Sequence, residues 1–514
     1  MQKELSGYFH QELTMPQQRT SGILLHPTSL PGPHGIGSLG SAAYRFVDFL
    51  AAAGHSLWQI LPLGPTGYGD SPYSALSAFA GNPLLICLER LVEAGDLDPD
   101  DIAGIDMEEG RVNYRFAHSL KTRLLRKASQ AFRNGKDRQR HQAFDKFCHE
   151  QVDWLDDYAL FQALRRKFKE ASWNTWPPEI RQRQPEALTF WKEELADGLR
   201  EQKYAQFVFY EQWFALKRYA SQQGVRLLGD MPIFVAFDSA DTWSHPELFQ
   251  LDQEMQPTLV AGVPPDYFSA EGQRWGNPLY RWERMAENNF AWWKSRLRWA
   301  LEQTDLLRID HFRGFDACWA IPAAEPTAIN GTWQPVPGSE FFKTLIEEFG
   351  QLPLIAEDLG VITPAVEALR DQFGLPGMKI LQFAFDSGSD NPYLPHNLQR
   401  RCVVYTGTHD NSTTLGWWQN LSSEAQQRVA SYLGRRVPSM PWDLIHTAMT
   451  SVADICIVPL QDLLGLDDSA RMNRPGQPEH NWGWRFAPGA LSEGLQRRLQ
   501  KLNELSGRAA KKGE

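Results

Sequence analysis

The sequence has few cysteines, no long apolar run and no excess of positive charge, and each absence excludes a class of protein. Its five scattered cysteines include no Cys-x-x-Cys pair, which argues against a disulfide framework or a zinc knuckle and fits a reducing compartment. No apolar run approaches the roughly 18 residues of a membrane-spanning helix. The formal net charge of −10 repels phosphate backbones, so nucleic acid is not expected as a partner.

The N-terminal stretch MQKELSGYFHQELTMPQQRTSG also has no apolar core of the signal-peptide kind, so the sequence predicts a cytoplasmic protein. A length of 514 residues with 42% hydrophobic residues is ample for a large core. That length suits two to four domains, or equally a single α/β barrel with insertions.

Eight short apolar segments, each ending in a polar or Gly/Pro-rich loop, are typical of buried strands. They are 22–26, 57–63, 225–233, 306–312, 352–360, 378–385, 402–410 and 454–462. Amphipathic helical patterns lie between several of them, for example at 42–54 and 364–374. Nearly continuous apolar strands alternating with helices indicate a parallel sheet, and eight of them favour a (β/α)8 TIM barrel over an open doubly wound sheet, which stays possible.

The spacing of these segments is uneven. We expect one catalytic barrel domain over 1–514, with large insertions after the second and third strands. The first, approximately 85–222, is charged and mostly helical in pattern. The second, 234–300, is rich in Pro, Gly and aromatic residues and is expected to be loop-rich and to cover the substrate.

Acidic residues follow several of the predicted strands. Asp230, Asp310, Glu357 with Asp358, and Asp410 stand at the ends of the third, fourth, fifth and seventh segments. One acid after a strand is usually a turn residue or helix cap. Four at the same end of a barrel, where active sites lie, point instead to a shared site.

The stretch LRIDHFRGF (307–315) places charged residues in an apolar strand. Side chains alternate across a strand, so Arg308 and Asp310 point the same way. The pair reads either as a buried structural salt bridge or as a nucleophile with its electrostatic partner. Carboxylates around one cleft can cleave a glycosidic bond, one protonating the leaving oxygen and one attacking the anomeric carbon.

With these residues in view, the chain resembles the amylomaltases, also called disproportionating enzymes or 4-α-glucanotransferases, which are relatives of the α-amylase superfamily. The resemblance runs almost end to end. It rests on GILLHPTSLPGPHGIGSLG (22–40), LPLGPTGYGDSPYSALSAFAGNP (61–83), GDMPIFVAFDSADTW (229–243), GVPPDYFSAEGQRWGNPLY (262–280), RIDHFRG (308–314), IAEDLG (355–360), THDNSTT (408–414) and NWGWRF (481–486).

The resemblance implies a retaining transfer of α-1,4-glucan segments, with the capacity to form cyclic glucans. Asp310 matches the nucleophile, Glu357 the general acid/base and Asp410 the stabiliser of the transition state. The substrate-binding residues that it implies are Arg308, His311, His409, Asp230, Tyr73, Asp266, Tyr267, Phe268, Trp275 and Asn481. Its expected partners are α-1,4-glucans and maltooligosaccharides, with no cofactor, no metal, and a monomeric or weakly oligomeric state.

Other interpretations have weaker signals. GIGSLG (35–40) matches the dinucleotide pattern, but the nine residues 27–35 run from the strand's end through the first glycine, where a tight turn should follow the strand directly, and no ribose-binding acid follows. His311 and His409 lack the spacing of a closed metal site. A retaining hydrolase of the amylase type would use the same carboxylates. A silent glucan-binding protein would be indicated by loss of one of them, and all three are intact.

Overall fold

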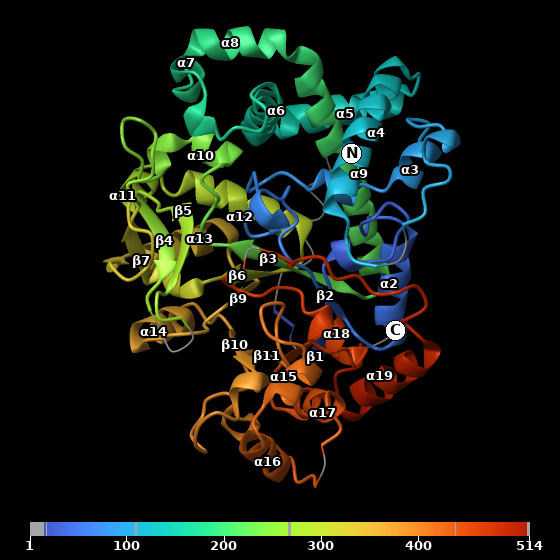
Figure 1. Ribbon diagram of the computed structural model, residues 1–514, viewed down its shortest axis with the longest axis vertical. Coiled ribbons are helices and arrows are strands. Elements are labelled where there is room, and N and C mark those ends of the chain that lie inside the picture. The colour runs from blue at the N-terminus through green and yellow to red at the C-terminus, as the bar shows by residue number, and fades with distance from the viewer. Residues whose placement is uncertain are drawn as a thin grey trace.

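The computed structural model describes residues 15–16, 18–107, 110–265, 269–436, 438–477 and 479–510. Eight parallel strands close into a barrel in the order β1-β12-β11-β10-β9-β6-β3-β2, which confirms the predicted (β/α)8 barrel (Figure 1). The barrel strands are β1 (Thr20–Leu24), β2 (Leu57–Gln59), β3 (Arg226–Pro232), β6 (Leu306–Asp310), β9 (Leu354–Ala356), β10 (Gly377–Ile380), β11 (Cys402–Tyr405) and β12 (Ile455–Pro459).

These strands fall within or overlap all eight predicted segments, because each is a run of buried apolar side chains. The strands end earlier than the apolar runs do. In the segment 378–385, for example, β10 stops at Ile380, and Leu381–Phe383 form a 3-10 turn closed by the Ala384 N–H on the Leu381 carbonyl at 3.0 Å. The apolar pattern continues past the strand because the turn is also buried, and burial alone does not distinguish the two.

Helices surround the barrel on its outer face. Those of the barrel layer and its periphery are α2 (Ser41–Ala52), α10 (Ala240–Ser244), α11 (Trp282–Glu287), α12 (Ala291–Gln303), α13 (Gly338–Phe349), α14 (Pro364–Gln372), α15 (Thr414–Asn420), α16 (Ser423–Tyr432), α17 (Trp442–Thr450), α18 (Leu460–Leu463) and α19 (Glu493–Leu505). The predicted helical patterns at 42–54 and 364–374 correspond to α2 and α14. Each turns an apolar stripe toward the core, for example Phe46, Val47 and Leu50 of α2.

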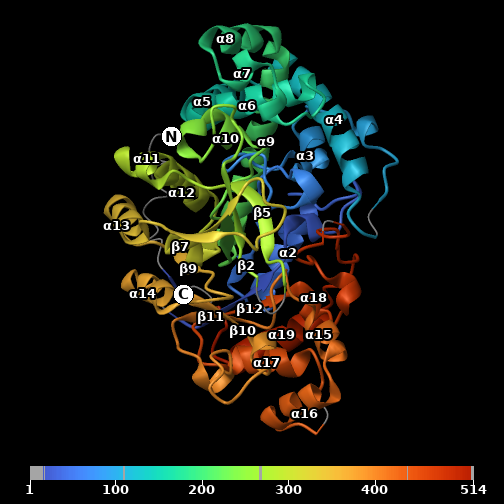
Figure 2. The ribbon, with the colours of Figure 1, turned by 60° about the vertical axis from the view of Figure 1, so that its left-hand side comes forward.

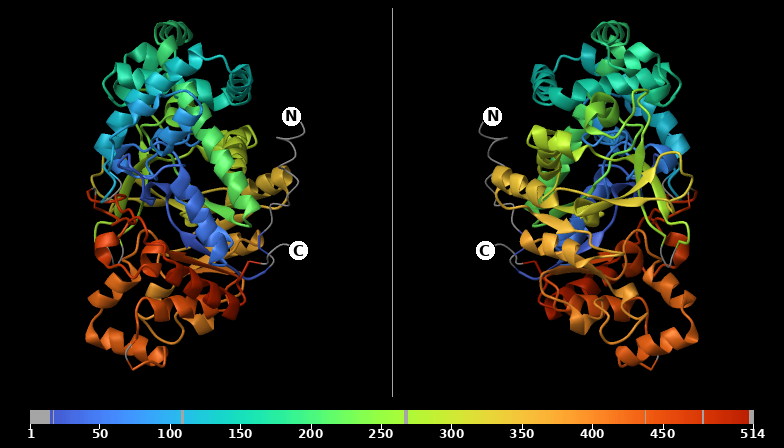
Figure 3. Two further views of the ribbon diagram at one scale, coloured as in Figure 1. Left: turned by 90° about the vertical axis from the view of Figure 1, so that its right-hand side faces the viewer. Right: turned by 90° about the vertical axis from the view of Figure 1, so that its left-hand side faces the viewer.

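A group of helices stands between β2 and β3. It comprises α3 (Leu88–Glu93), α4 (Tyr114–Asn134), α5 (Arg138–Glu150), α6 (Val152–Lys167), α7 (Pro178–Arg181), α8 (Pro185–Glu194) and α9 (Ala196–Gln222). Helix α9 packs on α4, α5 and α6 and also on β3, so it joins the group to the barrel. Figure 3 shows this group at one end of the molecule and the helices of 414–450 at the other, with the barrel between them.

A second sheet stands beside the barrel (Figure 2). Its four strands run in the order β5-β4-β7-β8, with β4 (Leu259–Val263), β5 (Gln273–Pro278), β7 (Ala317–Pro322) and β8 (Thr332–Pro335). All its pairings are antiparallel. The sequence pattern did not predict this sheet, because its strands are short and interrupted by Gly and Pro, residues that usually mark loops.

Candidate active site

The two acids expected to do the chemistry stand on neighbouring barrel strands. Asp310 is the last residue of β6, and Glu357 directly follows β9. The two strands pair through Ile309 and Ala356, so the acids come next in the same register at the carboxyl end of the barrel. The backbone N–H of His311 donates to Glu357 Oε2 at 2.6 Å, and that of Leu359 donates to Oε1 at 3.2 Å. The acid is therefore held by the turn that carries Asp310.

Arg308 lies between two carboxylates. Its Nη1 donates to both oxygens of Asp230 at 2.8 Å, and its Nη2 donates to Asp310 Oδ1 at 2.8 Å. Asp230 and Arg308 are directly paired in the ladder between β3 and β6 and are buried, whereas 28% of the Asp310 side chain is exposed. Both interpretations of the Arg308–Asp310 pair are thus compatible with this geometry. Arg308 makes a buried salt bridge with Asp230, and it also orients Asp310, the more exposed of its two carboxylate partners.

Glu357 and Asp230 differ in the balance of charges around them. Burial, together with the negative charges of Asp310 and Asp358, raises the pKa of Glu357 to about 8, against the opposing effects of Arg308 and the His311 N–H. Glu357 is therefore mostly protonated at neutral pH, as a general acid must be. Burial also raises the pKa of Asp230, and the positive charge of Arg308 opposes that rise without cancelling it.

Asp410 is oriented by a segment far away in the sequence. Asn473 Nδ2 donates to Asp410 Oδ1 at 2.6 Å, and Arg471 Nη2 donates to the Asp410 carbonyl at 2.6 Å. His409 Nε2 lies 3.4 Å from Asp410 Oδ2. Neither Arg471 nor Asn473 is predicted from the sequence. Their only local signal is a charged and amide-bearing stretch, RMN, between an apolar strand and the NWGW motif.

An aromatic wall joins these acids. The Tyr73 hydroxyl donates to Asp230 Oδ2 at 2.8 Å, and its ring stacks on His409 with centroids 5.2 Å apart and planes at 12°. The ring of Trp482 packs at 5.8 Å from that of Tyr73 and 5.9 Å from that of His409. Burial and the nearby Asp230 raise the pKa of Tyr73, so its hydroxyl keeps the proton that it donates.

His311 stands on the other side of Asp310. Its backbone is left-handed, with φ of 55°, and its ring meets Trp275 of β5 edge to face, with centroids 4.9 Å apart. Burial lowers the pKa of His311 to about 4, so the imidazole is neutral at pH 7. Among the described residues its Nε2 has no hydrogen-bond partner. Trp275 remains 39% exposed, as a ring that receives a ligand must be.

Among the described residues, Asn481 has no observed contact with the acids. Asn481 accepts from the Arg474 N–H at 2.9 Å and donates to the Gln477 carbonyl at 2.6 Å, so its amide closes its own loop. Asp266, Tyr267 and Phe268 lie outside the described residues.

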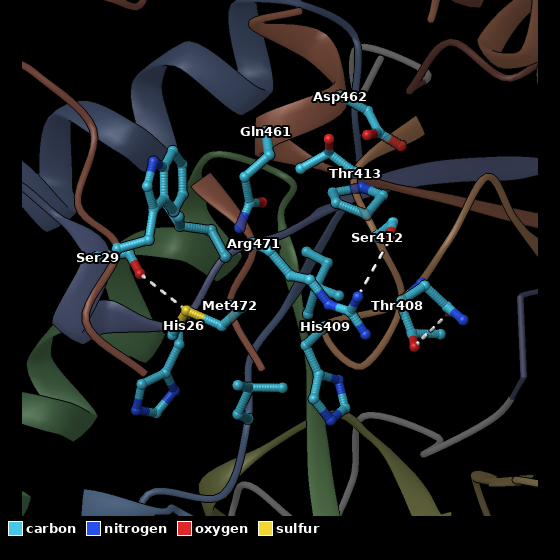
Figure 4. Close-up of a pocket in the computed structure, with 16 residues that line it drawn as sticks. His26, Ser29, Thr408, His409, Ser412, Thr413, Gln461, Asp462, Arg471 and Met472 are labelled. Atoms are coloured by element: carbon cyan, nitrogen blue, oxygen red, sulfur yellow. Dashed lines mark hydrogen bonds between the residues drawn. The ribbon is translucent and has the colours of Figure 1, made fainter. Parts of the chain in front are cut away.

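A small cavity of about 30 Å³ lies behind His409, at the carboxyl ends of β1, β11 and β12. Figure 4 shows the rings of His26 and His409 on the same side of it, with the Arg471 guanidinium above His409 and bonded to Ser412. Burial lowers the pKa of His26 to about 3, and its Nδ1 has no partner in the described part of the chain. A polar cavity of this size holds one or two waters.

The described ranges contain no group of three or more His, Cys, Asp or Glu side chains placed to hold a metal ion. Within the same ranges, no helix combines the length and apolar character needed to cross a membrane. The site as described therefore consists of four carboxyl groups, two arginines, two histidines and an aromatic wall. That set can carry proton transfer and nucleophilic attack at an acetal carbon.

Comparisons with known proteins agree with this arrangement. A family model described as 4-alpha-glucanotransferase matches residues 25–491. The 4-alpha-glucanotransferase of Thermus thermophilus is 51% identical over 502 residues, covering 96% of this chain and 100% of that protein, and that of Synechocystis sp. is 50% identical, covering 96% and 99%. The solved structure of an amylomaltase from Streptococcus agalactiae in complex with acarbose superposes with a TM-score of 0.93 at 39% identity, covering 96% of this chain and 100% of that one. The chain belongs to the 4-alpha-glucanotransferase family.

Proposed function

We propose that this protein transfers α-1,4-glucan segments from a donor to the 4-hydroxyl of an acceptor glucan or glucose, by a retaining double displacement. The observation that carries the mechanism is the pairing of two unlike carboxyls on neighbouring strands. Glu357 has its pKa raised to about 8, while Asp310 is partly exposed and bonded to Arg308. One acid that keeps its proton beside one that is ion-paired is the division of roles that a retaining mechanism requires.

In the first step Asp310 attacks the anomeric carbon. The bond from that carbon to the glycosidic oxygen breaks, and Glu357 gives its proton to the departing oxygen, so a glycosyl-Asp310 ester forms. In the second step the ionised Glu357 takes the proton of the acceptor's 4-hydroxyl, whose oxygen attacks the same carbon and releases Asp310. The configuration at the carbon is inverted twice and hence retained.

The other side chains of the site are assigned to the sugar. Asp410, oriented by Asn473, binds sugar hydroxyls and stabilises the distorted transition state. His409 and the neutral His311 donate hydrogen bonds, and Arg308 orients Asp310. Tyr73 and Trp275 supply flat apolar faces for sugar rings.

Transfer requires that an acceptor hydroxyl reach the ester before water does. The segment 262–278 suits that task, because its prolines stiffen it and Trp275 supplies apolar cover over His311. Tyr267 and Phe268, which belong to the same segment, are proposed to complete the cover. Holding the acceptor near its attack geometry is worth about 7 kcal/mol or more.

The deciding experiment is incubation with maltotriose and separation of the products. Transfer predicts glucose plus a ladder of longer maltooligosaccharides, with the total of reducing ends nearly constant. Trimming Tyr267 and Phe268 to alanine should slow transfer and raise the fraction lost to hydrolysis. Reducing ends that climb steadily, with no product longer than the donor, would identify a retaining hydrolase instead, and the absence of any turnover would identify a glucan-binding protein.

Four further expectations from the sequence accompany this proposal as predictions. They are a cytoplasmic location, a monomeric or weakly oligomeric state, no interaction with nucleic acid, and the division of the chain into one barrel with insertions at 85–222 and 234–300.

A further inference from the structure

An exposed tryptophan lies beside the catalytic turns but takes no part in the proposed mechanism. Trp333 stands on the edge strand β8 and is 37% exposed. It is directly paired with Trp319 of β7, and the two rings meet edge to face at 5.1 Å. Gly331 makes room for this pair, since a Cβ there would fall 2.3 Å from Trp319 Nε1. The backbone is thus shaped to keep the two rings together.

Arg313 lies against the Trp333 ring, its guanidinium carbon 3.8 Å from the ring centroid. Its Nη1 donates to the Val361 carbonyl. Arg313 follows Asp310 by three residues, and Val361 follows Glu357 by four. The ring is therefore tied to both turns that carry the proposed catalytic acids, and a cation over its face restricts its movement.

Two details indicate that this surface receives a ligand. Trp333 leaves 37% of its surface exposed although Arg313 lies over its ring. Beside Arg313, Val361 leaves 57% of its surface exposed. An exposed aromatic ring and an adjoining aliphatic side chain together suit the apolar face of a glucose unit.

We propose that Trp333, Val361 and Arg313 form a remote subsite for a glucose unit of the acceptor or leaving chain. The inference rests on the proposed function, because Glu357 protonates the leaving oxygen and the surface lies beside the loop that follows Glu357. The glucose unit stacks on the exposed part of the Trp333 ring and contacts the exposed Val361 side chain. Long acceptors reach this subsite, and free glucose does not.

Acceptor length provides the test. With α-maltosyl fluoride as donor, kcat/KM is measured for two acceptors, maltopentaose and glucose. The ratio of the two values is compared among the wild type, Trp333→Ala and Trp333→Phe. Trp333→Ala should lower this ratio about 5- to 20-fold, the loss of a stacking contact, and Trp333→Phe should lower it less. Phe190→Ala, which removes an aromatic ring that is 53% exposed on α8, should leave the ratio as in the wild type.

Binding separates this inference from the proposed function. In an Asp310→Asn background, calorimetry with maltoheptaose reports affinity whether or not the wild type transfers or hydrolyses. If Trp333→Ala weakens the affinity for maltoheptaose and Phe190→Ala leaves it unchanged, the subsite is supported even if the maltotriose assay shows a hydrolase. An unchanged length ratio together with unchanged maltoheptaose affinity in Trp333→Ala and Trp333→Phe overturns it. So does an equal loss for glucose and maltopentaose, which would mean that Trp333 only supports the fold.

Discussion

At the scale of single residues, the site separates two carboxyls by their surroundings rather than by their type. Glu357 is half-buried, and its donors among the described residues are the backbone N–H groups of His311 and Leu359. Asp310 is partly open and receives a guanidinium N–H. Because desolvation and nearby negative charges disfavour its ionised form, Glu357 keeps its proton, whereas Asp310 is ion-paired with Arg308.

Replacing these acids should have different consequences for different donors. Asp310→Ala should lower turnover of maltotriose by about 10⁴-fold or more, because no covalent intermediate forms. Glu357→Gln should be similarly damaging on maltotriose. With a glycosyl fluoride, whose leaving group needs little protonation, Glu357→Gln should still load Asp310, which mass spectrometry of the intact protein detects. Near-wild-type turnover of maltotriose by Glu357→Gln would refute the acid/base assignment.

The raised pKa of Glu357 predicts the alkaline side of the pH profile. The first step needs the protonated acid, and the protonated fraction falls tenfold per pH unit above a pKa of about 8. The kcat/KM for maltotriose should therefore be level near neutrality and decline above about pH 8. With a maltosyl fluoride donor this alkaline decline should be much weaker. The same decline with both donors would assign it to another group.

At the scale of elements, the barrel brings together contributions from four strands and from a loop after β12. Strand β3 supplies Asp230, β6 supplies Arg308 and Asp310, and the residues after β9 and β11 supply Glu357 and the His409–Asp410 pair. The segment after β12 supplies Arg471 and Asn473, which hold the Asp410 side chain and backbone from outside. The rigid strands fix the positions of Asp230, Arg308 and Asp310, whereas the position of Asp410 depends on a contact between two loops.

Asn473→Ala should therefore lower kcat more than it raises KM. A hydrogen bond to a charged group contributes about 1.5–3 kcal/mol, so its loss from the transition state corresponds to about a 10- to 100-fold decrease in kcat. Steady-state kinetics on maltotriose measure it. Asn330→Ala removes an exposed amide bonded to Glu325 and serves as the control. An unchanged kcat in Asn473→Ala would mean that Asp410 is oriented without it.

The packing of β1 against its neighbours gives a prediction about stability. A Cβ on Gly22 would lie 2.5 Å from the Cβ and carbonyl oxygen of Leu57 and 2.8 Å from Ile457 Cδ1. Gly22→Ala should therefore destabilise the protein by about 1–3 kcal/mol, the range for overpacked cores. The urea midpoint measures the effect. Gly494→Ala, in α19 with room for a methyl group, should leave the midpoint equal or slightly higher, because alanine favours helix. A midpoint for Gly22→Ala equal to that of the wild type would contradict this packing.

At the scale of the whole molecule, the closed barrel leaves its chemistry at one mouth and flanks it with separate structures. The helices α3 to α9 lie on one side and the four-stranded sheet on another (Figures 1 and 2). Trp275 of that sheet reaches His311, and Trp333 of its opposite edge strand reaches Arg313. The sheet therefore contacts both sides of the turn that carries Asp310.

In the proposed mechanism, carboxyl groups carry out the proton transfer and the nucleophilic attack. Activity should therefore survive removal of divalent metals. Dialysis against a chelator should leave the rate of maltotriose disproportionation unchanged. A loss of rate that calcium restores, with no change in the urea midpoint, would show that a cation takes part in the reaction.

Much of the fold was predictable from the sequence because its signals are local. Strand segments such as 402–410 are continuous apolar runs, and the pattern at 42–54 has the helical period, so each element is specified by its own residues. The polar residues at the strand ends also pointed to the mouth of the barrel, because the carboxyl ends of parallel strands share one face. The roles given to Asp310 and Glu357, however, came from a resemblance and stay predictions.

Tertiary structure decided what depends on contacts between distant residues. The Asn473–Asp410 bond joins residues 63 apart, and the Arg308–Asp230 pair joins residues 78 apart. No local period encodes such pairs. The sheet of β4, β5, β7 and β8 was not apparent either, because its strands gain their stability from cross-strand partners rather than from their own pattern. The sequence by itself determined the barrel and the kinds of side chain at its mouth. Only folding decided which carboxyl keeps its proton, because the pKa of Glu357 is set by burial and by charges that other strands bring to it.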